Sequence, residues 1–190
     1  MARQSKREEI AQAALREFHE RGFNATGISD ITVAAGAPKG SFYNHFASKE
    51  ECALEALARY AGGLRFDLLT TPGRPALERL RAHFEFLGQD TTDSGFAKGC
   101  LVGNFSAEVA DHSTDLRAAV KGGFDQWASL ISQVLTEAQA AAEVSGSLDA
   151  GATAVFILSA WEGTLLTARA QKSPAPFEAF FTTVFDVILR

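Results

Sequence analysis

The stretch APKGSFYNHFASKEE, from Ala37 to Glu51, carries polar side chains where a helix that only packs in a core would carry Leu and Ala. Its charged or hydrogen-bonding side chains, at the start of an expected short helix, are Lys39, Ser41, Asn44 and His45. Gly40 is unfavourable in a helix by about 1 kcal/mol relative to Ala, and a close approach of the backbone to a phosphate would explain it. Tyr43 can pack its ring while its hydroxyl meets a phosphate. These residue types suit a helix that lies in a DNA groove.

The first of the helices that must position this stretch lies at the N-terminus. Ile10, Ala14 and Phe18, spaced by four, predict a helix from about Ser5 to Arg21. Gly22 ends it in a left-handed conformation. The charged residues of MARQSKREEIAQAALREF leave no apolar core of a signal peptide. No apolar run approaches the roughly 20 residues that span a bilayer, so we expect a cytoplasmic protein with no membrane partner.

A second helix is expected from near Thr26, as its N-cap, to Gly36. Its core-facing residues would be Ile28, Ile31 and Ala35. Pro38 then occupies the first position of a third helix, which runs to about Phe46. Phe42 and Phe46, four positions apart, can face the core of the head. Two short helices that meet at a tight glycine turn are typical of a helix-turn-helix, although an ordinary helical hairpin with a solvated polar face has the same spacing.

Ser48 and Glu51 predict a capping box that opens a fourth helix, which runs to about Leu69. Lys49, in its first turn, can reach a phosphate, and the helix N-terminus also suits an anion. The stretch TTPGRP breaks the chain next. Further helices are expected near 75–89, 97–110, 114–143, 150–171 and 175–189, with breaks at DTTDSG, DHS, SGSLD and KSPAP. The fold class is therefore all-α, with a three-helix head over 1–48, a body over 49–190, and helix 49–69 as the connection between them.

Composition agrees with a helical globular chain. The 190 residues are 46% hydrophobic and carry a formal net charge of -5. Residues 1–50 contain seven Lys and Arg against six Asp and Glu, whereas the remainder contains eleven against seventeen, so a slightly basic head joins an acidic body. The two cysteines, Cys52 and Cys100, cannot form a disulfide framework or a zinc site by themselves. We expect no metal and no cofactor.

The segment TGISDITVAAGAPKGSFYNHFASKEE closely resembles the DNA-binding head of the TetR family of transcriptional repressors. The shared features are a Thr, a hydrophobic-acidic-Ile step, Ala-Gly, Lys-Gly-Ser, Phe-Tyr and a Phe before Ser-Lys-Glu, and the resemblance covers about residues 5–55. It implies an all-helical homodimer with an N-terminal helix-turn-helix head and a C-terminal ligand-binding and dimerisation domain. The last two helices would form the four-helix bundle of the dimer. Two-fold symmetry predicts a near-palindromic operator in double-stranded DNA.

The same resemblance assigns the recognition helix to 38–45. The residues that would face the major groove are Lys39, Gly40, Ser41 and Asn44. The residues that would mostly hold phosphates are Thr26, Tyr43, His45 and Lys49. Because only contacts at base edges carry sequence information, the first group would set the choice of operator.

The stretches KGCLVGNFSAEVADHSTDLRAAV and WEGTLLTARAQKS resemble a branch of this family that represses genes for detoxifying electrophiles and reactive carbonyls. In that branch the cysteine of a Gly-Cys-Leu step is the sensor, and a basic residue of the penultimate helix can lie near it. The matching positions are Cys100 and Arg169, where the best-known sensor of the branch has Lys at the second position. Arg can stabilise a thiolate, but it is a poor nucleophile toward sulfur. The alternative for Cys100 is a buried, inert thiol.

The expected effector pocket gathers aromatic and apolar side chains of the body around an unusual Trp-Glu pair. Its members are Asn104, Phe105, Trp127, Ile131, Trp161, Glu162 and Leu165, with Phe86 nearby. Glu162 in an apolar helix needs a partner or a raised pKa, and it can bind a ligand, cap the dimer interface or point to solvent. Gly163 beside it would let another helix approach closely. The residues expected in the dimer core are Phe177, Phe180, Phe181 and Phe185.

Three classes of function compete. The favoured one is a repressor released from DNA by an electrophile or by a non-covalent small molecule. A small enzyme could combine Cys100 with His112 or His83 and Asp111, but no motif marks a base or an oxyanion site. A helical adaptor without DNA binding would be favoured by loss of Tyr43 or Lys49, and both are present. We therefore expect a regulator that is not an enzyme.

Overall fold

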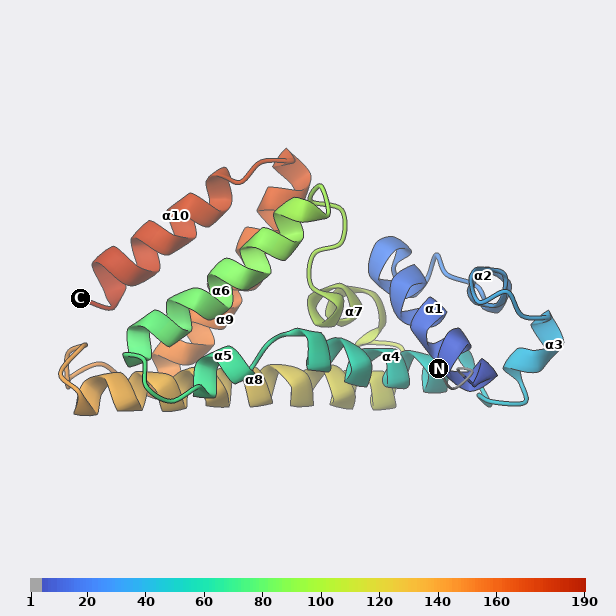
Figure 1. The fold of residues 1–190 in the computed structure, drawn as a ribbon, viewed down its shortest axis with the longest axis horizontal. Helices are drawn as coiled ribbons and strands as arrows, with labels where there is room; N and C mark the ends of the chain where they lie inside the picture. Colours follow the sequence, from blue (N-terminus) through green and yellow to red (C-terminus); the bar gives the residue numbers. More distant parts are fainter. Residues whose placement is uncertain (1–4) are drawn as a thin grey trace. The chain divides into compact units, whose positions relative to one another are not determined.

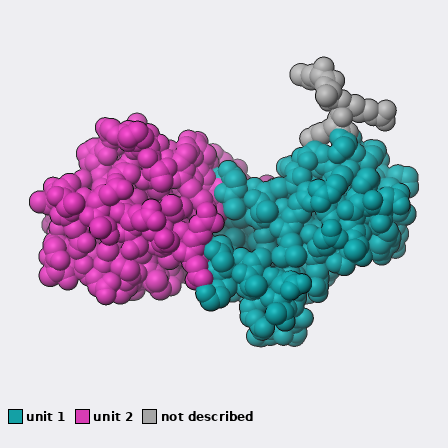
Figure 2. All heavy atoms as spheres, turned by 90° about the horizontal axis from the view of Figure 1, so that it is seen from below, with its two compact units in different colours: residues 1–63, 100–123 teal, residues 64–99, 124–190 magenta. Residues whose placement is uncertain are grey.

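The computed structural model describes residues 5–190, whose regular elements are all helices (Figure 1). Arg3, which the charge count of the head includes, lies outside them. Packing divides the chain into two compact units (Figure 2): unit 1 contains Met1–Gly63 and Cys100–Gly123, and unit 2 contains Leu64–Gly99 and Phe124–Arg190. The expected all-α class is confirmed. The functional division at residue 48 stays a prediction.

Helix α1 (Lys6–Arg21) begins and ends close to the expected positions. The Ser5 hydroxyl accepts a hydrogen bond from the Glu8 N–H at 3.2 Å, which satisfies one free donor of the first turn. The expected apolar stripe, Ile10, Ala14 and Phe18, is fully buried. Gly22 follows with φ 84° and ψ 169°, a positive-φ conformation that only glycine adopts readily, although its ψ differs from that of a left-handed helix.

Helix α2 (Ile28–Ala34) begins later than the sequence predicted, so the assignment of Thr26 as its N-cap was wrong. Gly27 is the N-cap, and its N–H donates to the Asp30 carboxylate at 2.7 Å. The Thr26 hydroxyl instead points inward and donates to the Gly22 and Glu17 carbonyls at 2.7 and 3.2 Å. Thr26 therefore stabilises the turn between α1 and α2.

Helix α3 (Lys39–Phe42) is a single turn, shorter than predicted, and Pro38 is its N-cap. Helix α4 (Lys49–Gly63) opens as expected, because the Glu51 N–H donates to the Ser48 hydroxyl at 3.0 Å. It ends before the predicted Leu69, since two glycines close it and Arg65 then adopts a left-handed φ of 54°.

The elements after α4 complete the two units. Unit 1 contains helix α7 (Leu101–Val109) and the first part of helix α8 (Thr114–Ala140), whose remainder belongs to unit 2. Unit 2 also contains α5 (Asp67–Thr70), α6 (Ala76–Asp93), α9 (Ala150–Gln171), α10 (Ala175–Thr183) and the π-helix η1 (Val184–Ile188). Helix α6 extends into the expected DTTDSG break and ends at Asp93, and the Thr91 and Thr92 hydroxyls donate to the Leu87 and Gly88 carbonyls one turn earlier.

Aromatic packing fills the core of unit 2. Trp161 lies 5.0 Å from Phe84, 5.4 Å from Phe177 and 5.0 Å from Phe180, between ring centroids. Phe177, Phe180 and Phe185 are buried within their own chain, which argues against the expected dimer-core role for these three. Phe181 is half-buried, and its role in a dimer stays a prediction. Phe177 and Phe180 cover the tryptophan of α9, because α9 and α10 lie side by side (Figure 1).

Helix α9 qualifies by length and apolar composition as a candidate membrane span, contrary to the sequence expectation. Soluble core helices pass the same test. In this structure α9 buries one face against its own unit, including Ile157, Trp161 and Leu165. Its other face carries the exposed side chains Val155, Phe156 and Leu166.

His83 makes a polar contact inside this aromatic core. The Trp127 Nε1–H donates to His83 Nε2 at 3.0 Å, and both side chains are buried. Because Nε2 accepts this bond, the imidazole is neutral in the folded protein. Burial lowers the pKa of His83 from 6.5 to about 4.

The His83 pKa predicts a loss of stability in mild acid. Between the unfolded pKa of 6.5 and the folded pKa of about 4, the unfolded chain binds more protons than the folded one. The free energy of unfolding should therefore fall by about 2 kcal/mol from pH 7.5 to pH 5 through this residue alone. Urea unfolding at both pH values measures the loss. His83→Gln, which keeps an acceptor for Trp127, should show a drop smaller by that amount, and equal drops would contradict the assignment.

Candidate nucleic-acid interface and effector region

The recognition segment is anchored by its two phenylalanines. Phe42 and Phe46 are buried, and their ring centroids lie 5.5 Å apart. The Arg7 guanidinium of α1 lies 4.8 Å from the centroid of the Phe46 ring. The Tyr43 ring meets Phe42 edge-on at 5.5 Å, yet 59% of Tyr43 remains exposed. The apolar side of the segment therefore holds α3 and the following turn, while the phenol faces solvent.

The opposite side of α3 presents the residues expected to meet DNA, which differ in how accessible they are. Those that are exposed are Lys39, Gly40, Tyr43 and Asn44. Ser41 and His45 are half-buried, and the Ser41 hydroxyl donates to the Pro38 carbonyl at 2.7 Å. Apart from the adjoining residues and the backbone of its own helix, no atom of the described chain lies within 4 Å of the position that a Cβ would take at Gly40. The fold itself therefore gives no steric reason for glycine at this position.

Thr26 and Lys49 both donate to backbone carbonyls of the head, and their expected contacts with phosphates stay a prediction. Thr26 is fully buried, with its hydroxyl bonded to backbone carbonyls. The Lys49 ammonium donates to the Phe23 and Thr26 carbonyls at 3.0 and 3.1 Å and lies 4.1 Å from the centroid of the Phe23 ring. Burial lowers the pKa of Lys49, and the nearby Glu108 carboxylate opposes that effect. The turn between α1 and α2 needs these donors, because its carbonyls have left the helix.

The two cysteines both belong to unit 1 but differ in position. Cys52 lies near the start of α4, and burial raises the pKa of its thiol to about 12, which keeps the sulfur protonated. Cys100 is the N-cap of α7, is 4% exposed, and its carbonyl accepts a hydrogen bond from the Asn104 N–H at 2.9 Å. Arg169 lies in the last turn of α9, in unit 2. The pairing of Cys100 with Arg169 therefore stays a prediction.

The predicted pocket residues are divided between the units. Asn104 and Phe105 belong to α7 of unit 1, where Phe105 packs on α1. The members buried in the core of unit 2 are Trp127, Ile131, Trp161 and Leu165. Sequence reasoning missed the bond between Trp127 and His83, because the two residues lie on different helices. His83, proposed as a base for Cys100 in the enzyme alternative, is occupied by this bond instead.

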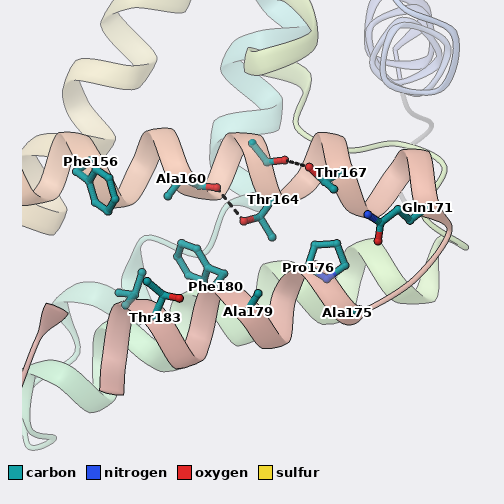
Figure 3. Close-up of a pocket in the computed structure, with 12 residues that line it drawn as sticks. Phe156, Ala160, Thr164, Thr167, Gln171, Ala175, Pro176, Ala179, Phe180 and Thr183 are labelled. Atoms are coloured by element: carbon teal, nitrogen blue, oxygen red, sulfur yellow. Dashed lines mark hydrogen bonds between the residues drawn. The ribbon is translucent and has the colours of Figure 1, made fainter. Parts of the chain in front are cut away.

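Two apolar hollows flank the exposed face of α9, and Gly163 borders both. The first, about 610 Å³, lies between α9 and α10. Figure 3 shows its walls, with Phe156, Ala160, Thr164 and Thr167 facing Pro176, Ala179, Phe180 and Thr183. The second, about 550 Å³, lies between α8 and α9 and includes Phe124, Leu166 and Glu162. Glu162 therefore lines this hollow, and one oxygen of its carboxylate is buried.

Two protein-family models match the chain. The model described as bacterial regulatory proteins, tetR family, matches residues 10–56. The model described as tetracyclin repressor-like, C-terminal domain, matches residues 76–184. The first covers α2, α3 and most of α1 and α4, and the second covers most of the remaining helices, so the two matches together span the candidate interface and the effector region.

Individual proteins are similar over nearly the whole length. The HTH-type transcriptional repressor DhaR of Mycobacterium sp. is 32% identical over 192 residues, which cover 100% of this chain and 95% of DhaR. A crystal structure of regulatory protein TetR from Rhodobacter sphaeroides is 32% identical, has a TM-score of 0.86, and covers 92% of this chain and 94% of its own. The reduced form of E. coli NemR is 30% identical with a TM-score of 0.84, and 97% of each chain is covered.

The inward position of Lys49 predicts how its loss acts. Lys49→Met should lower the free energy of unfolding by about 1–3 kcal/mol, because the Phe23 and Thr26 carbonyls each lose one hydrogen bond. It should leave the slope of log K against log salt unchanged for a random-sequence duplex, since the ammonium is directed into the head. Lys39→Met, which removes an exposed charge from α3, is the comparison and should reduce the slope by about 0.9. A reduced slope for Lys49→Met would show that Lys49 reaches a phosphate after all.

Proposed function

Because this chain belongs to the TetR family of bacterial regulatory proteins, we propose that it is a homodimeric transcriptional repressor. It binds a near-palindromic operator through the segment 38–45 and leaves it when an effector acts in the C-terminal part. The single observation that carries this proposal is the two-sided recognition segment. Phe42 and Phe46 bury one side, and the other side exposes polar groups to a partner.

The chemistry of the exposed side suits a DNA groove. Lys39 supplies a charge for phosphates or for guanine acceptors, and Asn44 can pair with the edge of adenine. Tyr43 offers a hydroxyl to the backbone. Gly40 has no internal steric reason to be glycine, so we assign its lack of a side chain to a close approach of DNA. Ser41 and His45 remain proposed contacts, with Ser41 limited by its bond to the Pro38 carbonyl.

A second copy of the chain is the proposed occupant of the outer face of α9 and α10. This face exposes Val155, Phe156 and Leu166, an unusual cluster of large apolar residues for a surface in water. Gly163 at its centre has no neighbour within 4 Å of a hypothetical Cβ, which leaves room for a crossing helix. A two-fold dimer built on this face would present two recognition segments, as a palindromic site requires.

We propose two ways in which an effector could release the protein from DNA, and they differ in whether the effector reacts with Cys100. In the first, a small electrophile adds to the Cys100 thiolate, and a change at the N-cap of α7 follows. The solved structure of E. coli NemR, which is 30% identical, is described as the reduced form of that protein. In the second, a non-covalent ligand enters near Trp127 and Trp161. Arg169 is a proposed stabiliser of the thiolate in the first mechanism.

The dimer proposal predicts the effect of a charge on α9. Phe156→Glu places a carboxylate on a side chain that is 53% exposed in the single chain and would be buried between two copies. The variant should sediment as a monomer at micromolar concentration and lose specific DNA binding, while its far-ultraviolet circular dichroism stays helical. Gln133→Glu, on the exposed side of α8, is the matched control and should remain dimeric. A dimeric Phe156→Glu protein would place the interface elsewhere.

Fluorescence anisotropy with DNA from upstream of its own gene tests both release mechanisms. N-ethylmaleimide should release the wild-type protein, because its alkene alkylates the thiolate and the proton is supplied by solvent. Cys100→Ser should stay bound, and Cys52→Ala should respond as wild type does, since Cys52 is buried and protonated. Binding that ignores the reagent would favour the non-covalent mechanism. Absence of specific binding to any palindromic DNA would refute the repressor and favour the adaptor.

A further inference from the structure

Helix α7 supplies part of the core of the head, although more than thirty residues separate it from the end of α4. The Phe105 ring lies 5.7 Å from both Phe18 and Phe23, in edge-on contact with each. Phe18 and Phe23 stack on one another at the same distance. Phe23 belongs to the turn between α1 and α2, so one aromatic ring of α7 packs directly against that turn.

Glu108, one turn after Phe105, makes a polar contact with the same turn. Its carboxylate accepts a hydrogen bond from the Asn24 backbone N–H at 2.8 Å. The carboxylate also lies directly beside Gly22, where a Cβ would meet it unless the Glu108 side chain moved. Gly22 has a positive φ, which by itself favours glycine at this position. Glu108 therefore contacts the turn at Asn24 and lies against it at Gly22.

The turn is anchored from three helices in total. Thr26 binds the end of α1, the Lys49 ammonium of α4 binds the Phe23 and Thr26 carbonyls, and Glu108 of α7 binds the Asn24 N–H. Helix α2 begins directly after this turn, and α3 follows α2 after a short turn. The placement of the turn therefore determines where α2 starts and, through it, where α3 lies.

We propose that Glu108 is a positioning residue for DNA binding, which holds the turn between α1 and α2 in its DNA-binding arrangement directly from α7. The inference rests on the proposed function, because it assigns a control point to the same DNA-binding head. Cys100 caps the N-terminus of α7 and Glu108 lies near its C-terminus. A displacement of α7 that begins at Cys100 thus reaches the head through one short helix.

Two variants of Glu108 separate the hydrogen bond from the charge. Glu108→Gln keeps an oxygen that can accept from the Asn24 N–H, whereas Glu108→Met keeps the length and loses the acceptor. At fixed salt, Glu108→Met should bind the DNA from upstream of its own gene about tenfold more weakly than wild type does. This corresponds to a change of about 1.4 kcal/mol in the free energy of binding. Glu108→Gln should stay within about twofold. Hydrogen exchange of the Asn24 amide in the free protein should be faster only in Glu108→Met.

Further readouts distinguish positioning from unfolding and from a lost DNA contact. The DNA-competent fraction in a stoichiometric titration should match wild type, and so should the slope of log K against log salt. Asp111→Met, which removes an exposed carboxylate next to α7, is the matched control and should bind as wild type does. Wild-type affinity in Glu108→Met, or an equal loss in Glu108→Gln, would overturn the inference and leave the repressor intact. If the wild-type protein does not bind DNA, both the proposed function and this inference are refuted.

Discussion

The turn between α1 and α2 satisfies only part of its backbone hydrogen bonding from within, and other helices of unit 1 supply the further partners that it needs. Its carbonyls and amides have left one helix and not yet entered the next, so they need partners from elsewhere. Lys49 of α4 supplies two donated hydrogen bonds, and Glu108 of α7 supplies an acceptor. An ammonium and a carboxylate near one another are well suited to this work, since each compensates the charge of the other.

This arrangement explains why the head includes residues from far along the chain. Unit 1 contains Cys100–Gly123 in addition to the N-terminal helices, and Phe105 completes a triangle of rings with Phe18 and Phe23. A short helical head buries little apolar surface by itself, and a borrowed ring adds to it. If Glu108 positions this turn as we propose, the position of the recognition segment depends on a helix that begins directly after Cys100.

In unit 2, the polar groups of two buried side chains, His83 and Trp127, lie among aromatic rings. The hydrogen bond from Trp127 to His83 satisfies one donor and fixes the neutral form of the imidazole. Phe177 and Phe180 of α10 pack on Trp161 and are buried inside the chain. What remains for a partner is the outer face of α9, whose exposed apolar residues are spaced around a glycine.

The sequence by itself determined the features that depend on neighbours a few residues apart. The all-α class, the buried Phe42 and Phe46, the cap at Ser48 and the family likeness of the head all follow from spacing along single helices or from a short motif. Only the tertiary structure decided the inward roles of Thr26 and Lys49, the partner of Trp127, and the side that the phenylalanines of α10 face. The physical reason is that helical periodicity tells which residues share a face but not which surface covers that face. For Glu108 and Asn24, 84 residues apart, that information exists only once the helices have packed.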